Sequence, residues 1–237
     1  MLIERRAYTM RPGRMEDFIA AQFARGFGPP MNRVLDRLIG YFRTVSGPTD
    51  QMVHLWRFDG FDDWTARLHG LYGRPELEPY FKTVRSLMLA QENAFLAPAP
   101  VPQLTPYWGN GNDWLAEQGP RLAAAEAALI EETAYQLLPG TLPAFWDGLR
   151  QEGLRAEAAG RHLFGAFHTT IGQLHRVLIY RHYAGLEQRL AHRAALRADP
   201  AWQGFERRIG AEGASATAML LQPIDGREMS PFFSPAS

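Results

Sequence analysis

The sequence predicts an α+β protein made of two tandem units, each with the element order βαββαβ. Two observations lead to this prediction: the chain repeats itself with a period near 125 residues, and both copies show the same succession of strand and helix signals. Such a period exceeds the units of solenoid proteins, so each copy is expected to have its own core. We expect a first domain at residues 1–97, a linker at 98–128, a second domain at 129–223 and a tail at 224–237.

The repeat is clearest at the start of each copy. A shift of 127 residues gives eight identities within 17 positions, pairing Leu2, Ile3, Glu4, Ala7, Tyr8, Pro12, Gly13 and Phe18 with Leu129, Ile130, Glu131, Ala134, Tyr135, Pro139, Gly140 and Phe145. A shift of 125 places GYFRTVSG at 40–47 on GAFHTTIG at 165–172. A shift of 124 places Trp56 on Tyr180 and His54 on Leu178. The shift changes by only one or two residues along the repeat, and such insertions and deletions are expected to fall in turns. The two copies are therefore expected to share one fold.

The first copy shows each expected element in turn. Residues 2–9 read as a strand, and Pro12-Gly13 turn the chain into a helix whose apolar side chains recur on one face. Residues 40–46 and 52–58, rich in aromatic and β-branched types, flank turn residues at 46–50 and predict a hairpin. The copy ends with helices near 61–72 and 76–89 and a strand near 91–96.

The second copy shows the same helix-start and turn signals. Thr141 is a candidate N-cap with Pro143 just inside the helix, and a hairpin is expected from Phe164–Thr170 and Arg176–Tyr183. The order βαββαβ is the ferredoxin-like plan, an antiparallel four-stranded sheet with helices on one face. Because the other face must also be buried, two such units are expected to pair face to face, within a chain or between chains.

The linker combines proline residues with aromatic ones. Prolines at 98, 100, 102 and 106 disfavour helix and central strand, so this part is expected to be semi-rigid. The segment from Tyr107 to Trp114 is expected either to pack on a domain or to form a lid over a pocket. Residues 121–128, RLAAAEAA, are predicted to form a short helix, and Phe232-Phe233 are expected to anchor the tail.

Composition excludes several classes of function. Twenty-five acidic and 25 basic residues leave a formal charge of zero, which gives no net field for nucleic acid or an anionic membrane. The absence of cysteine excludes disulfides, thiolate catalysis and cysteine-ligated metals. No apolar window approaches the length of a spanning helix, and the first ten residues lack a signal peptide. We therefore expect a cytoplasmic protein without membrane insertion or a nucleic-acid partner.

Four segments of the first copy resemble a known family. ERRAYTMRPG, LIGYFRTVSGP, QMVHLWRFDGF and LAQENAFLAP are similar, in this order and spacing, to the signature segments of the NIPSNAP family. Residues 129–223 resemble it more loosely, through EETAYQLLPG, GAFHTTIG and DPAWQGF. The resemblance implies a dimeric α+β-barrel fold, in agreement with the βαββαβ order. The wider superfamily that it resembles includes cofactor-free oxygenases, isomerases and haem enzymes, so the resemblance implies no single activity.

Alternation along the strands groups the candidate site residues. One face of the first and third strands is polar and aromatic, with Glu4, Arg6, Tyr8, His54 and Trp56. The other face is mostly apolar, with Ile3, Ala7, Val53 and Leu55, although Arg5 and Arg57 also lie on it. Because the apolar face suits contact with helices, we assign the polar and aromatic face to a cavity between the paired sheets. Apolar walls with a few convergent polar groups are typical of small-molecule sites.

Each candidate residue has a functional and a structural interpretation. His54 or Glu4 would transfer a proton, Tyr8 and Arg6 would hold an oxygen atom, and Trp56 would stack on the substrate. The alternatives are a structural Glu4–Arg6 ion pair, a core tyrosine, a core histidine and a core tryptophan. Glu92 lies in the last-strand segment that matches the family, and it is expected to reach the same cavity. Catalytic candidates are thus His54, Tyr8 and Glu4, and substrate-binding candidates are Arg6, Trp56 and Glu92.

The second copy contains further histidines but no recognisable metal motif. His162, His168, His175 and His182 have no characteristic ligand spacing, so we predict surface and edge histidines, no bound metal and no cofactor. The chain lacks the HExxH, P-loop, GxGxxG and GxSxG motifs. The sequence favours a cofactor-independent enzyme of the proton-transfer, isomerase or oxygenase type acting on a hydrophobic or aromatic molecule. The alternative is a non-catalytic ligand- or protein-binding module. Pairing of the domains within the chain and a homo-oligomer are both expected.

Overall fold

The computed structural model describes residues 1–26, 36–109, 112–114, 121–123, 126–225 and 229–234. The first unit contains, in order, β1 (Leu2–Met10), α1 (Met15–Ala21), β2 (Leu38–Ser46), β3 (Gln51–Phe58), α3 (Phe61–Tyr72), α4 (Glu78–Ser86) and β4 (Met88–Pro98). The second contains β8 (Leu129–Gln136), α5 (Leu142–Gln151), β9 (Leu163–Ile171), β10 (Arg176–Tyr183), α6 (Leu186–Ala198), α7 (Pro200–Ala211) and β11 (Ser215–Pro223). The predicted βαββαβ order is confirmed in both copies.

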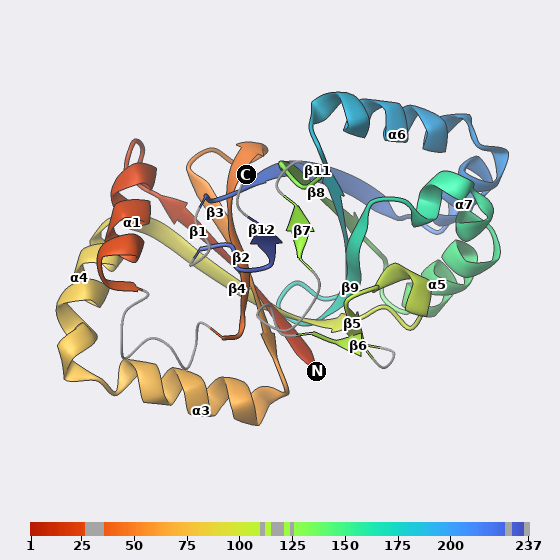
Figure 1. Ribbon diagram of the computed structural model, residues 1–237. Coiled ribbons are helices and arrows are strands. Elements are labelled where there is room, and N and C mark those ends of the chain that lie inside the picture. The colour runs from red at the N-terminus through yellow and green to blue at the C-terminus, as the bar shows by residue number, and fades with distance from the viewer. Residues whose placement is uncertain (27–35, 110–111, 115–120, 124–125, 226–228, 235–237) are drawn as a thin grey trace.

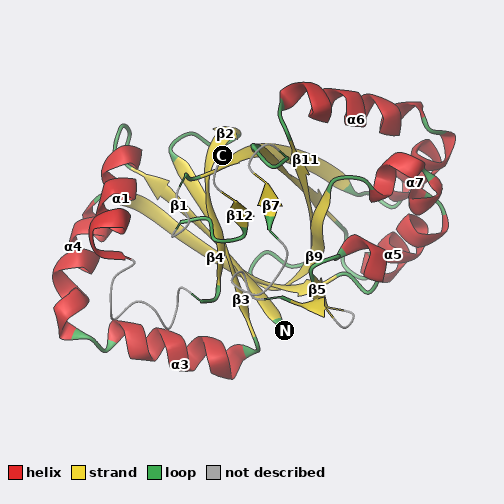
Figure 2. Ribbon diagram, viewed as in Figure 1, coloured by secondary structure: helices red, strands yellow, loops and turns green. Residues whose placement is uncertain are grey.

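The eight long strands form one closed antiparallel barrel within the chain. Their order around the barrel is β1-β3-β2-β11-β8-β10-β9-β4, and β4 returns to β1. The units join at two seams, where β11 pairs with β2 and β4 pairs with β9. The helices of the first unit cover one side of the barrel and those of the second cover the opposite side (Figures 1 and 2). Each sheet therefore has one face against helices and one face toward the barrel interior.

Both faces of the strands are buried, and three apolar cores result. One core lies between the first sheet and its helices, and a second lies between the other sheet and its helices. The third fills the barrel interior and includes Ile3, Ala7, Val53 and Leu55. The assignment of these four side chains to the helix contact was wrong, because they point into the barrel. The polar and aromatic face of the first sheet is the face that the helices cover.

The linker and the tail contribute side chains to the barrel interior. Trp108 and Phe232 are fully buried there, with ring centroids 5.3 Å apart. Short strands β7 (Leu122–Ala123) and β12 (Phe233–Ser234) pair in parallel, and Figure 1 shows them between the two halves of the barrel. The expected packing of the aromatic linker and the anchoring of the tail are thus confirmed for the described residues. The remaining short strands are β5 (Trp108–Gly109) and β6 (Asn112–Asp113).

The helix predicted over residues 121–128 is wrong. Leu122–Ala123 is extended because it pairs with the tail and buries Leu122 in the barrel, a tertiary contact that overrides local helix preference. Residues 124–125 lie outside the described chain, as do 110–111 and 115–120 of the linker. At α5 the predicted boundary is correct, since the helix begins after Thr141. Its hydroxyl donates to the Leu138 carbonyl, 2.9 Å away, and does not cap the helix.

A glycine two residues before a phenylalanine marks the same place in both copies. Gly40 precedes Phe42 on β2, and Gly165 precedes Phe167 on β9. A Cβ at Gly40 would lie 3.0 Å from the Phe42 ring, and one at Gly165 only 2.6 Å from the Phe167 ring. Beside each glycine the strand pairing shifts register, which is how a β-bulge re-aims side chains. The glycines let each phenylalanine ring fold back over its own strand.

Candidate functional site

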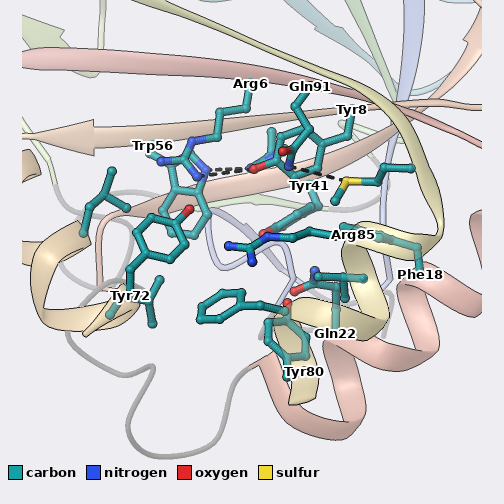
Figure 3. A pocket seen from close by; sticks show the side chains of 16 residues that line it. Arg6, Tyr8, Phe18, Gln22, Tyr41, Trp56, Tyr72, Tyr80, Arg85 and Gln91 are labelled. Carbon is teal, nitrogen blue, oxygen red and sulfur yellow. Dashed lines mark hydrogen bonds between the residues drawn. The ribbon is translucent and has the colours of Figure 1, made fainter. Parts of the chain in front are cut away.

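A small pocket lies between the first sheet and its helices. Its volume is about 100 Å³, and its walls come from β1, β2, β3, β4, α1, α3 and α4 (Figure 3). The polar lining residues are Arg6, Tyr8, Gln22, Tyr41, His54, Trp56, Tyr72, Tyr80, Arg85 and Gln91. Of the six predicted site residues, the pocket brings together Arg6, Tyr8, His54 and Trp56. They meet under the helices and not between the sheets, which corrects the predicted location of the cavity.

Arg6 and Tyr8 form one polar wall of the pocket. Arg6 donates from Nη1 to the Tyr8 hydroxyl at 3.3 Å (Figure 3). The Nε atom of Arg6 lies 2.8 Å from Glu4 Oε1. The pKa of Arg6 is raised above its usual value. Burial alone would lower this pKa, but the interactions with Tyr8 and Glu4 outweigh burial. Burial also raises the pKa of Tyr8, which Arg6 offsets only in part. At neutral pH the wall therefore presents a charged guanidinium and a protonated phenol.

Glu4 stands behind Arg6 rather than in the pocket. Its side chain is fully buried, and Asn93 donates to Oε1 at 2.7 Å. Glu4 is not among the residues that line the pocket, so its geometry is that of a positioning residue for Arg6. This arrangement agrees with the structural ion pair that the sequence left as an alternative.

Glu92 does not reach the pocket. It pairs with Ala7 across β1 and β4, so it shares the barrel-side face, and its side chain is exposed. Its neighbours Gln91 and Asn93 lie on the opposite face: Gln91 lines the pocket and Asn93 bonds to Glu4. The prediction that Glu92 shares a cavity with His54 was wrong. Gln91, one position earlier, lines the pocket instead, because neighbouring residues of a strand point to opposite faces.

His54 is fixed as a neutral hydrogen-bond donor. The Trp56 indole N–H donates to His54 Nδ1 at 2.7 Å, which leaves the proton of the neutral ring on Nε2. Burial, together with the charges of Arg6 and Arg5, holds the pKa of His54 well below its usual value. Nε2 is buried, and no hydrogen-bond partner for it occurs in the described chain. His54 therefore offers an unused N–H group.

Tyr41 completes the aromatic surroundings of His54. It lies opposite His54 across β2 and β3, and the two rings stack with centroids 4.4 Å apart. Burial raises the pKa of Tyr41 well above its usual value, so this phenol also stays protonated. Sequence reasoning missed Tyr41, although its place in the predicted hairpin partner of His54 could have indicated it. It also missed Gln22, Tyr72, Tyr80 and Arg85, because helix-borne lining residues depend on how the helices dock.

Two lining residues of the pocket, one on α3 and one on α4, are exposed to solvent. Tyr72 at the end of α3 is 51% exposed, and Arg85 on α4 is exposed as well. Figure 3 shows Arg85 extending from α4 toward the other lining side chains. Its guanidinium carbon lies 5.3 Å from the centroid of the Phe81 ring. Arg85 and Tyr72 are therefore positioned to contact whatever enters.

The second unit lacks the same set of side chains. The strand pairings align Glu4 with Glu131, Trp56 with Arg181 and His54 with Ile179. The shift between the third strands is therefore 125, and the predicted match of His54 with Leu178 was one residue off. With either shift, the position equivalent to His54 in the second unit is not a histidine. A candidate site built on His54 belongs to the first unit alone.

Three histidines of the second unit lie near one another. His162 lies near His182 and His192, with ring centroids 6.0 and 5.2 Å away. His192 is bonded on both sides, to the Tyr183 hydroxyl and to the Ala158 carbonyl. His168 lies near Trp146 instead. Within the described residues, no group of three or more potential ligands is arranged to hold a metal ion.

The closed barrel of two βαββαβ units, with a pocket under the helices, defines an α+β-barrel protein. The NIPSNAP family model matches residues 3–103 and 130–221, so the chain belongs to the NIPSNAP family. This confirms the resemblance seen in the sequence. In the part of the chain that is described, no helix has the length and apolar character needed to span a bilayer.

Known proteins resemble the chain in sequence and in fold. Human NipSnap homolog 2 is 27% identical over 195 residues, covering 82% of this chain and 59% of that protein. Zebrafish (Danio rerio) NipSnap homolog 1 is 26% identical, covering 82% and 61%. The chain thus spans about three fifths of the length of these relatives. A solved anthrone oxidase-like protein superposes with a TM-score of 0.57 at 10% identity, covering 94% of this chain and 91% of that one, which shows a shared fold.

Proposed function

We propose that the first unit binds a hydrophobic or aromatic small molecule in this pocket and stabilises negative charge on one of its oxygen atoms. The observation that carries the proposal is the set of donors in one aromatic pocket: the Arg6 guanidinium, the Tyr8 hydroxyl and the free Nε2–H of His54. Tyr8 accepts from Arg6, so its own proton remains available for a ligand. Donors held in a partly dry site stabilise an oxyanion far better than water-exposed donors do.

The enzymatic form of this proposal is cofactor-independent. Stabilising an enolate or phenolate lowers the pKa of the C–H or O–H group that ionises, so that water can take its proton. This ionisation is the first step of isomerisation or of reaction with dioxygen. His54 acts here as a donor, because Trp56 occupies Nδ1 and burial keeps the ring neutral. The anthrone oxidase-like protein with the same fold supports this reaction class by analogy.

A non-catalytic binding role is the second candidate, and the size of the pocket favours it. A volume of about 100 Å³ lies well below the several hundred cubic ångströms usual for sites that enclose a drug-sized ligand. Glu4, the carboxylate beside Arg6, does not line the pocket, and its Oε1 is engaged by Arg6 and Asn93. A module that binds a small ligand without converting it needs only the three hydrogen-bond donors of Arg6, Tyr8 and His54.

The first test is to purify the protein gently, record its ultraviolet-visible spectrum and identify any released small molecule by mass spectrometry. The second test is a titration with 4-nitrophenol, whose phenolate is followed by absorbance. We expect the bound probe to ionise at a lower pH than the free probe. Tyr8→Phe should reduce this effect without unfolding the protein.

The repeat supplies a matched control for the Tyr8 test. Tyr135 is the equivalent tyrosine of the second unit, and it lies outside the pocket. Tyr135→Phe should bind and ionise the probe as the unmodified protein does. Equal behaviour of Tyr8→Phe and the unmodified protein would refute a role for this pocket. Recovery of a bound compound unchanged after incubation in air would favour the binding module over the enzyme.

A further inference from the structure

Arg181 is a buried arginine whose charge is only poorly compensated. Its side chain lies on the helix-covered face of β10, directly opposite Glu131 on β8, and the residue is 1% exposed. Nε and Nη1 are both buried, and neither has a hydrogen-bond partner among the residues that the structure describes. Unpaired donors on a buried charge cost free energy, so they indicate a group that can accept from them.

Two further arginines surround the same carboxylate. Arg189 and Arg193 project from α6 and form ion pairs with Glu131, which also accepts from the Thr133 hydroxyl. Two guanidinium groups therefore pair with one buried carboxylate, and Arg181 lies opposite that glutamate across the strand pair. Three arginines against one glutamate leave two positive charges unbalanced within this cluster. The side chains of Arg189 and Arg193 are 19% and 25% exposed, so the cluster reaches the surface through α6.

The first unit shows that the fold does not require these arginines. A uniform shift of 125 residues aligns Arg181, Arg189 and Arg193 with Trp56, Trp64 and Leu68. Trp56 and Leu68 line the pocket of the first unit, and Trp64 packs against the same core. Three apolar or aromatic positions of one copy are thus all arginine in the other. If these positions served only to pack the helix against the sheet, apolar side chains such as those of the first unit would be sufficient.

We propose that Arg181, Arg189 and Arg193 form an anion-binding site in the second unit, distinct from the pocket of the first, that takes a phosphate group. A divalent phosphate matches the two unbalanced charges, and its oxygen atoms suit the fork of donors that arginine presents. Arg181 forms the deep end of the site, and Arg189 and Arg193 form its entrance. Glu131 holds the two entrance arginines in place.

The test is the melting temperature of the full chain in sodium phosphate, compared with sodium chloride and sodium acetate at equal ionic strength and pH. Phosphate should raise the melting temperature by about 2 to 4 °C over both references. Isothermal titration with inorganic phosphate should show one site. Arg193→Gln, a change at a partly exposed position, should weaken phosphate binding roughly tenfold or more.

Arg197→Gln is the matched control, because Arg197 is exposed on the same helix and outside the cluster. It should bind phosphate as the unmodified chain does. Arg181→Met tests the deep end and should abolish the phosphate response while the protein remains folded. No stabilisation beyond that in chloride, an equal effect of acetate, or an Arg193→Gln variant that binds normally would each overturn the proposal.

Discussion

Arg5 and Glu132 occupy equivalent positions of the two copies, 127 residues apart, and they bind each other inside the barrel. Arg5 donates to the two carboxylate oxygens at 2.8 and 3.0 Å, and the Tyr180 hydroxyl donates to Glu132 at 2.7 Å. Although burial opposes its ionisation, Arg5 keeps the pKa of Glu132 below its usual value. Equivalent positions that touch lie near the pseudo-twofold axis of the barrel. If two copies of the first unit paired in this way, Arg5 of one copy would face Arg5 of the other, and the like charges would repel. The Arg5–Glu132 ion pair therefore favours a barrel made of one first unit and one second unit.

Removing one partner of this pair should strongly destabilise the protein. Glu132→Gln leaves a buried arginine without its counter-charge, and we expect a loss of about 3 to 5 kcal/mol in the free energy of unfolding. Urea denaturation followed by circular dichroism measures it. The control is Asp147→Asn, which breaks the exposed pair with Arg150 and should cost less than about 1 kcal/mol. Similar small losses in both variants would contradict the role given to Arg5.

Acid should destabilise the fold through His192. Burial lowers the pKa of His192 to about 4, so the folded protein keeps it neutral while the unfolded chain binds a proton near its ordinary pKa of about 6.5. The contribution of His192 is therefore complete above pH 6.5 and is lost as the pH falls toward 4. Between these values, His192→Gln should show a shallower decline of unfolding free energy than the unmodified protein. His69→Gln, on the exposed side of α3, controls for loss of a histidine.

The tail should contribute to the stability of the barrel. Phe232 is fully buried, and its ring centroid lies 5.0 to 5.3 Å from those of Tyr107, Trp108 and Phe164. Phe232→Ala should therefore cost about 3 to 5 kcal/mol in unfolding free energy. Trp114→Ala, at a residue 39% exposed, should cost less than about 1 kcal/mol. A Phe232→Ala variant as stable as the unmodified chain would show that the tail does not hold the interior.

The glycine at the bulge of β9 should resist substitution. Because a Cβ at Gly165 would lie 2.6 Å from the Phe167 ring, Gly165→Ala should destabilise by about 1 to 3 kcal/mol through overpacking. Adding Phe167→Leu, which shortens the side chain, should recover part of this loss. Gly160→Ala, where a Cβ meets nothing within 4 Å, is the control. Chemical denaturation of the four proteins tests the series.

The sequence predicted the repeat, the element order and the hairpins because these depend on local patterns. The hairpin strands expected at 40–46 and 52–58 are β2 (Leu38–Ser46) and β3 (Gln51–Phe58). Alternation also grouped Arg6, Tyr8, His54 and Trp56 correctly on one face. It could not say which face the helices cover, because every residue of β3 is buried. Arg5 did not fit the otherwise apolar face on which the sequence placed it. Its partner Glu132 lies 127 residues away in the sequence, and only the folded barrel brings the two together.

Closure of the barrel also limits how the chain can meet other proteins. Each of its eight strands has a neighbour on both sides, so these strands offer no free edge to which a peptide or a second chain could add a strand. A partner that binds this barrel must therefore contact helices, turns or the ends of the barrel. The homo-oligomer expected from the sequence would therefore have to form without adding a strand to either barrel.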